Sequence, residues 1–154
     1  MLAYLSLGSN LGDRARWLRL GVDVVAETDE CRISAVYETA PVGGPTQGPF
    51  LNLVVELETS ATPRALLERC RRAEAAAGRV RDVRFGPRTL DADVLLVDDL
   101  VVADADLEVP HPRMYERRFV LEPLAELAPH LVETEVLDRA VGEVVRLGTL
   151  DEFR

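Results

Sequence analysis

The feature that most constrains the fold is the run at residues 86–96, G-P-R-T-L-D-A-D-V-L-L, in which two carboxylates stand two residues apart among apolar residues. The glycine and proline predict a turn, and the residues that follow predict a mostly buried strand over 89–97. Side chains alternate between faces along a strand, so Asp91 and Asp93 are expected on one face, about 7 Å apart. The other face is expected to carry the apolar residues Leu90, Ala92, Val94 and Leu96.

Two carboxylates on a mostly buried strand repel each other and lose hydration. A hard divalent cation between them removes both costs, and Mg²⁺ prefers one or two carboxylates together with phosphate oxygens. The alternative is a solvated acidic face on a half-exposed strand, which is the more frequent meaning of a bare D-x-D pattern. The neighbouring residues therefore have to decide between the two interpretations.

Length and composition predict one domain over residues 1–154. The chain is 47% hydrophobic, which is typical of a folded globular protein with a real core. The apolar start lacks a basic segment, and no apolar stretch approaches membrane-spanning length, so we expect a stand-alone cytoplasmic protein. Cys31 and Cys70 lack paired spacing, which argues against a disulfide framework or a zinc site, and both are expected to be packing residues.

Charge points to a small anionic ligand. The net charge of −9 argues against general nucleic-acid binding. Seven of the 18 arginines nevertheless fall between residues 69 and 88, beside the two carboxylates. Guanidinium groups bind phosphate oxygens bidentately, so this segment is suited to a small polyanion. Part of the cluster is expected to be a solvated helix face formed by Arg69, Arg71 and Arg72 with Glu68 and Glu74.

Strand and helix signals alternate along the first 97 residues. Strands are predicted at 2–7, 32–38, 50–58 and 89–97, and loops at 39–49 and 79–87. A helix capped by Asn10 or Asp13 follows the first strand, with Arg14, Arg16 and Arg19 on its exposed side. A second helix begins with Thr62 as N-cap and ends at Gly78. The order β-α-β-β-α-β predicts an α+β fold of the ferredoxin-like type.

The remaining residues predict additions to this core. A hairpin is expected near residues 98–99, a P-H-P turn at 110–112 and short helices over 113–128. The tail, 135–148, predicts one more helix and one more strand.

Four collinear motifs carry a resemblance to a known family. They are Y-L-S-L-G-S-N-L-G-D at 4–13, Y-E-T-A-P at 37–41 leading to F-L-N at 50–52, G-R-V-R at 78–81 with G-P-R-T-L-D-A-D at 86–93, and V-P-H-P-R-M at 109–114 continuing to Arg117 and Phe119. In this order and spacing the chain resembles the 6-hydroxymethyl-7,8-dihydropterin pyrophosphokinases of folate biosynthesis. The resemblance covers residues 1 to about 130.

The resemblance implies transfer of the β,γ-pyrophosphoryl group of ATP to the hydroxymethyl oxygen of the pterin, with release of AMP. Such a transfer depends on positioning and charge neutralisation. Asp91 and Asp93 would hold two Mg²⁺ ions, and Arg79 and Arg88 would contact the transferring phosphates. The nucleotide contacts implied by the resemblance are Glu74, Arg81, Arg88, His111 and Arg117.

The resemblance also implies a flat pterin slot. Phe50 and Phe119 would stack on the two faces of the ring, and Asn52 would bind its polar edge, with backbone groups near Thr39 and Val42. Taken from the residues alone, each has an ordinary structural explanation: the two aromatic residues suit a core, the asparagine suits a turn, and His111 suits a surface turn.

The chain departs from the family pattern at four positions: Ala92 between the aspartates, Phe85 where tryptophan is common, and Asp106 and Glu108 where some relatives bind nucleotide. The implied partners are ATP and the reduced pterin, bound by a monomer without nucleic acid or membrane. Three alternatives stay open: a nucleotide-sensing binding module, a metal-dependent phosphohydrolase that uses the same aspartates, and a degenerate partner subunit.

Substituting Arg79→Ala or Arg88→Ala is expected to slow transfer far more than it weakens pterin binding, because guanidinium groups at these positions would stabilise charge that develops on the phosphates. Single-turnover rates and pterin binding measured on the same variants test this expectation. Unchanged single-turnover rates in both variants would contradict the assigned roles.

Overall fold

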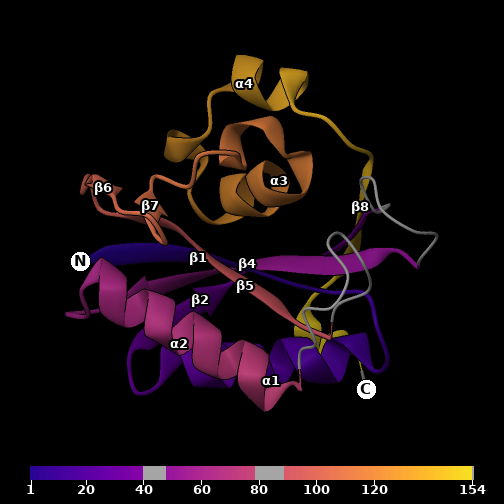
Figure 1. The fold of residues 1–154 in the computed structure, drawn as a ribbon. Helices are drawn as coiled ribbons and strands as arrows, with labels where there is room; N and C mark the ends of the chain where they lie inside the picture. Colours follow the sequence, from indigo (N-terminus) through magenta and orange to yellow (C-terminus); the bar gives the residue numbers. More distant parts are fainter. Residues whose placement is uncertain (40–47, 79–88, 154) are drawn as a thin grey trace.

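The structure, a computed structural model, describes residues 1–39, 48–78 and 89–153. Its first part follows the order β1 (Leu2–Ser9), α1 (Arg14–Ala26), β2 (Glu30–Ile33), β3 (Val36–Thr39), β4 (Phe50–Glu58), α2 (Pro63–Ala76) and β5 (Asp91–Val97). The strands form one antiparallel sheet in the order β5-β1-β4-β3-β8, and β2 also pairs with β4. The predicted ferredoxin-like arrangement is therefore confirmed, with α1 and α2 on one face of the sheet (Figure 1).

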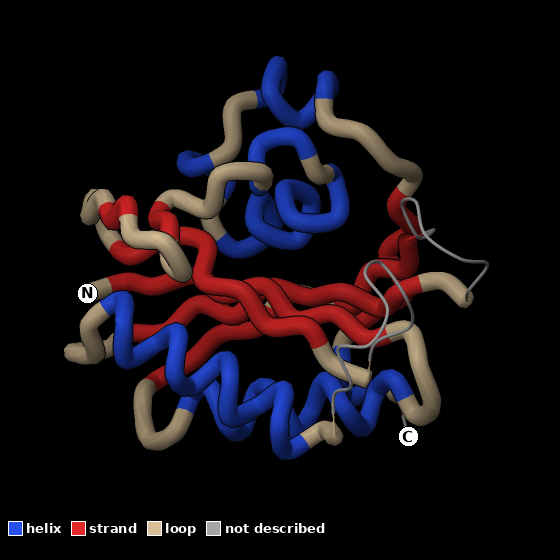
Figure 2. The backbone as a smooth tube through the Cα atoms, in the orientation of Figure 1, coloured by secondary structure: helices blue, strands red, loops and turns tan. Residues whose placement is uncertain are grey.

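The rest of the chain places α-helices over the opposite face, adds one strand to the sheet and returns at its end to the face that carries α1 (Figure 1). It comprises β6 (Val102–Ala103), β7 (Glu108–Val109), the 3₁₀ turn η1 (Met114–Glu116), α3 (Arg118–Leu127), η2 (Pro129–Leu131), α4 (Thr134–Arg139), β8 (Val144–Gly148) and η3 (Leu150–Glu152). The predicted short helices and the final helix and strand are confirmed. Figure 2 shows the sheet as a middle layer between the two groups of helices. Across the described residues, no helix is both long and apolar enough to cross a membrane.

Two apolar cores follow from this layering, one on each face of the sheet. The larger packs α1 and α2 against one side of the sheet, and it includes four alternating residues of β4: Leu51, Leu53, Val55 and Leu57. The smaller core lies between the sheet and α3 and includes Tyr4, Val54, Leu95, Leu96, Met114, Val120 and Leu124. The sheet is therefore buried on both sides over most of its length.

The alternation of side chains between the two faces reverses before the end of β5, the strand that carries the two carboxylates. A register shift against β1 between Tyr4 and Leu5 leaves Leu95 as the extra residue of a β-bulge in β5. Before the bulge the predicted alternation holds, and Val94 lies in the larger core. Leu96 instead lies in the smaller core, so its predicted placement with Val94 is wrong. The inserted residue turns the remainder of the strand over.

The strand predicted at 32–38 is two strands, because the chain bends at Ser34 and Ala35. The Ser34 hydroxyl accepts a hydrogen bond from the Val54 backbone at 2.9 Å, while the Ser34 backbone donates to the Val54 carbonyl. The Ala35 backbone then donates to the carboxylate of Glu126 on α3 at 2.9 Å. A side-chain acceptor thus replaces one rung of the ladder and redirects the strand.

Helix α2 has the predicted ends. The Thr62 hydroxyl accepts from the Ala65 backbone at 3.1 Å, Pro63 is the first helical residue, and Gly78 follows the helix with a φ of +67°. Helix α1 is capped by Asp13, one of the two candidates.

Two charged residues of α2 are buried, so their predicted place on a solvated face is wrong. Arg69 lies 2.7 Å from Asp29 and also donates to the Val25 carbonyl at the end of α1. Glu74 is only 6% exposed. Both flank the apolar stripe of the helix and use their length to reach polar partners at its border. Arg71 and Arg72 are exposed, as predicted.

Three smaller expectations are also corrected. Residues 98–99 form a turn, but the hairpin that follows joins β6 to β7 around residues 104–107. Cys31 is exposed, whereas Cys70 is buried as predicted. Arg14 and Arg19 are half-buried, because they donate to the carbonyls of Pro49 and Leu150.

Candidate active site

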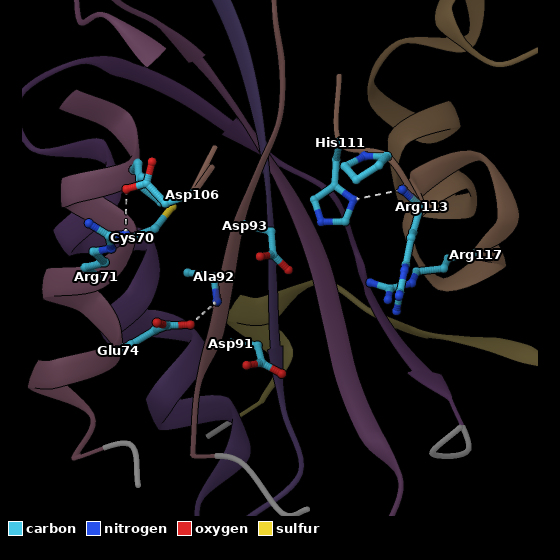
Figure 3. A pocket seen from close by; sticks show the side chains of 12 residues that line it. Cys70, Arg71, Glu74, Asp91, Ala92, Asp93, Asp106, His111, Arg113 and Arg117 are labelled. Atoms are coloured by element: carbon cyan, nitrogen blue, oxygen red, sulfur yellow. Dashed lines mark hydrogen bonds and ion pairs between the residues drawn. The ribbon is translucent and has the colours of Figure 1, made fainter. Parts of the chain in front are cut away.

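A pocket of about 470 Å³ lies at the edge of the sheet formed by β5, within the size range of small-molecule sites. Helix α2 forms one wall, β5 the floor, and the segment from 111 to 117 the opposite wall (Figure 3). The lining residues are Leu67, Cys70, Arg71, Glu74, Asp91, Ala92, Asp93, Asp106, His111, Pro112, Arg113 and Arg117. Five of the predicted site residues therefore meet in one place.

Asp91 and Asp93 both face this pocket, as strand alternation predicts (Figure 3). Ala92 between them is 6% exposed and packs into the larger core. The buried carboxylate of Glu74 accepts a hydrogen bond from the Ala92 backbone at 3.1 Å. Glu74 therefore fixes the strand that carries the two aspartates.

His111 and Arg117 lie on the wall across from the aspartates. The His111 backbone donates to the Leu95 carbonyl at 2.9 Å, which ties this wall to β5. The ring Nδ1 accepts from the Arg113 backbone at 3.2 Å, so the proton of the neutral ring is assigned to Nε2. Burial, followed by the charges of Arg117 and Arg113, lowers the pKa of His111 below its ordinary value of 6.5.

A second polar group lies on the same face of the sheet, on the other side of β1. The buried Asn52 amide donates to the Thr39 hydroxyl at 3.1 Å. Gly8 pairs with Asn52 on one side and with Asp91 on the other. A β-carbon on Gly8 would lie 2.7 Å from the Asn52 side-chain oxygen, so only glycine leaves the asparagine its place. The predicted pterin-binding pair, on β4 and β3, thus lies across β1 from the carboxylates on β5.

The two predicted stacking residues are half-buried. Phe50 begins β4, and its ring is 3.6 Å from the β-carbon position of Gly8. Phe119 lies in the first turn of α3 and packs against the smaller core. The guanidinium of Arg117 lies over the Phe119 ring, 5.6 Å from its centre. Phe119 is therefore in contact with Arg117, which belongs to the pocket wall of residues 111–117.

Several predicted residues lie outside the described part of the chain. They are Val42, Arg79, Arg81, Phe85 and Arg88. Their roles stay predictions from the sequence.

Sequence reasoning missed other pocket residues, among them Arg71, Asp106 and Arg113. The hydrogen bonds from Arg64 and Arg71 lower the pKa of Asp106 to about 2. Cys70 is buried beside Asp93 and Glu74, and its pKa is raised first by burial and then by these two carboxylates. The sequence offered a signal for two of these residues: Arg113 lies in the P-H-P-R-M motif beside His111, and Asp106 occupies a position where some relatives bind nucleotide.

The donor set fits a cation that takes most of its ligands from elsewhere. Within the described ranges, no three His, Cys, Asp or Glu side chains come together as a metal site. A pair of aspartates on an open pocket suits Mg²⁺, which keeps waters and phosphate oxygens in its coordination sphere, and does not suit a closed structural site.

Residues 4–129 match the family model described as 7,8-dihydro-6-hydroxymethylpterin-pyrophosphokinase. The chain belongs to this family. It is 43% identical over 159 residues to the 2-amino-4-hydroxy-6-hydroxymethyldihydropteridine pyrophosphokinase of Bacillus subtilis, covering 99% of this chain and 95% of that protein. It is 50% identical over 133 residues to the enzyme of the same name from Methylorubrum extorquens, covering 84% of each.

A longer relative is the folic acid synthesis protein fol1 of Schizosaccharomyces pombe. It is 36% identical over 95% of this chain, which corresponds to 21% of fol1. Family membership confirms the predicted function, transfer of the pyrophosphoryl group of ATP to the hydroxymethyl group of the dihydropterin in folate biosynthesis.

In the free protein, His111 is expected to titrate below pH 6.5, because burial and two nearby cations disfavour the imidazolium. Arg117→Met removes one cation and should therefore raise the pKa. NMR titration of the ring protons measures both values, and a His130→Gln background leaves a single histidine signal. Arg139→Met, on α4 outside the pocket, is the control and should leave the pKa unchanged. A free-protein value at or above 6.5 would contradict the described environment.

Proposed function

We propose that the pocket on β5 binds Mg-ATP, with Asp91 and Asp93 holding magnesium and the opposite wall binding the phosphates. The supporting observation is the opposition of charge: two carboxylates face His111 and Arg117 across one pocket. A polyphosphate with bound cations carries both signs of charge and complements both walls. When bound, the metal ions neutralise the phosphates and orient the transferring group.

Residues of the protein itself contact the phosphates and position the aspartates. Arg117 offers a guanidinium fork to phosphate oxygens, and the Nε2–H of His111 donates to another oxygen. A bound phosphate would raise the pKa of His111 and favour its charged form. Glu74 fixes the Ala92 backbone and thereby the positions of the aspartates. We propose that Arg79, Arg81 and Arg88 add positive charge at the transferring phosphates, as the family motifs imply.

The pterin is proposed to lie over Gly8, with its polar edge at Asn52 and Thr39 and its faces against Phe50 and Phe119. This place supports the reaction because Gly8 is the pairing partner of both Asp91 and Asn52. The hydroxymethyl group of a ring held there is proposed to lie on the side of Asp91 and Asp93. Backbone groups near Val42 are proposed to complete the pterin edge. A monomer that acts in the cytoplasm stays a prediction from the sequence.

Asp91→Asn and Asp93→Asn should lower AMP formation from Mg-ATP and hydroxymethyldihydropterin by about 10²-fold or more, since each removes a charge that holds magnesium. Both variants should still fold, because asparagine keeps the shape of aspartate. Asp99→Asn, in the turn after the same strand, is the matched control and should behave as the unchanged enzyme. Near-normal turnover in the pocket variants would rule out the metal role. Phosphate release without a pterin acceptor would favour a phosphohydrolase.

Gly8→Ala should raise KM for the pterin roughly 10-fold or more, because the new methyl group displaces the Asn52 side chain. Nucleotide binding should change little, since the aspartates and the opposite wall are untouched. Gly48→Ala is the control, because a β-carbon there meets no atom of the described residues within 4 Å. Steady-state kinetics with each substrate varied in turn measure both effects. An unchanged pterin KM in Gly8→Ala would refute the proposed pterin position.

A further inference from the structure

Seven of the 13 arginines in the described part of this acidic chain have a carboxylate within 4.0 Å. Ion pairs within 4.0 Å involve Arg14, Arg32, Arg64, Arg69, Arg71, Arg72 and Arg146. Even the pocket residue Arg71 is paired twice, with Glu68 at 3.0 Å and Asp106 at 3.2 Å. Its charge is therefore already compensated within the protein.

Arg113 and Arg117 are different. Both line the pocket, and neither has a carboxylate partner among residues 1–39, 48–78 and 89–153. In Figure 3 the side chains of both run from the wall of 111–117 toward the pocket, across from the two aspartates. Arg117 has the face of Phe119 beneath it, whereas Arg113 is exposed.

The positive charges of Arg113 and Arg117 both act on the His111 ring. Each disfavours the charged form of His111, which places both within electrostatic reach of its ring. Two like charges on one wall of a pocket give that wall a positive potential. The aspartates lie across the pocket, and no described carboxylate forms an ion pair within 4.0 Å with either arginine. An anion that binds at this wall is attracted by both guanidinium groups.

We propose that Arg113 is a further phosphate-binding residue, which with Arg117 forms a two-guanidinium clamp for the polyphosphate of the nucleotide. This inference rests on the proposed place of Mg-ATP in the pocket. The planar fork of arginine binds phosphate oxygens bidentately, and two forks fit successive phosphates of one chain. The backbone of Arg113 also holds His111 Nδ1, so one residue supplies a phosphate contact and orients a second donor.

The test compares Arg113→Met and Arg113→Lys with the unchanged protein by calorimetry, with inorganic tripolyphosphate, a nonhydrolysable ATP analogue and adenosine as probes, all with Mg²⁺. Arg113→Met should weaken tripolyphosphate and the analogue by roughly 10- to 100-fold, as expected for a lost charge-assisted contact. Adenosine binding should not change. Arg113→Lys should recover part of the loss, because a point charge replaces the fork.

Arg139→Met is the matched control, because this exposed arginine also has no carboxylate partner among the described residues but lies outside the pocket. It should bind all probes as the unchanged protein does. An equal loss in both variants would show only a general charge effect and overturn the inference. Retained tripolyphosphate affinity in Arg113→Met, with an unaltered thermal midpoint, would also overturn it.

Kinetics separate this inference from the proposed function. In Arg113→Met, KM for ATP should rise while KM for the pterin holds, a split that a general loss of structure would not give. AMP formation by the unchanged enzyme tests the proposed function on its own. If that enzyme forms AMP while Arg113→Met binds tripolyphosphate normally, the clamp is wrong and the proposed function stands. If it forms no AMP while the variant loses tripolyphosphate, the clamp stands and the function fails.

Discussion

The pairing of β1 with both of its neighbours is the constraint on which the site depends. β1 lies between β5 and β4, and Gly8 has Asp91 on one side and Asn52 on the other. Backbone hydrogen bonds set the spacing of such neighbours, so the distance from carboxylate to amide is fixed by the sheet and not by loops. The missing side chain at Gly8 keeps the surface between them open. A flat ligand can therefore lie across three strands and reach groups on both outer ones.

The pocket at the edge of this surface carries opposite charges on two of its sides. The aspartates lie on the floor formed by the edge strand, and His111 and two arginines lie on the wall that faces them. That wall is attached to the same strand by the bond from the His111 backbone to Leu95. The negative groups on β5 and the positive groups on the wall of residues 111–117 are thus held at fixed positions relative to one another. Such preorganisation matters for phosphoryl-type transfer, in which the protein mainly positions groups and neutralises charge.

The alternation of side chains in the strands and the caps of α2 were enough to predict the ferredoxin-like order. The four motifs were enough to predict that Asp91, Asp93, His111 and Arg117 belong to one site. Three details could not be predicted. The bulge at Leu95 depends on pairing with a distant strand, and no local pattern marks it. The bend at Ser34 depends on Val54 and Glu126. The burial of Arg69 and Glu74 depends on partners in α1 and β5, since helical periodicity places both at the border of the apolar stripe.

The contact of Glu74 with Ala92 also bears on how copies of this protein meet in a crowded solution. β5 is an edge strand, and its outer backbone groups would otherwise recruit a strand from another molecule. Two of these groups are already occupied within the chain, the Ala92 N–H by the Glu74 carboxylate and the Leu95 carbonyl by the His111 backbone. The same bonds that shape the pocket therefore discourage aggregation through this edge, and the strand can stay open to a small anion while closed to another polypeptide.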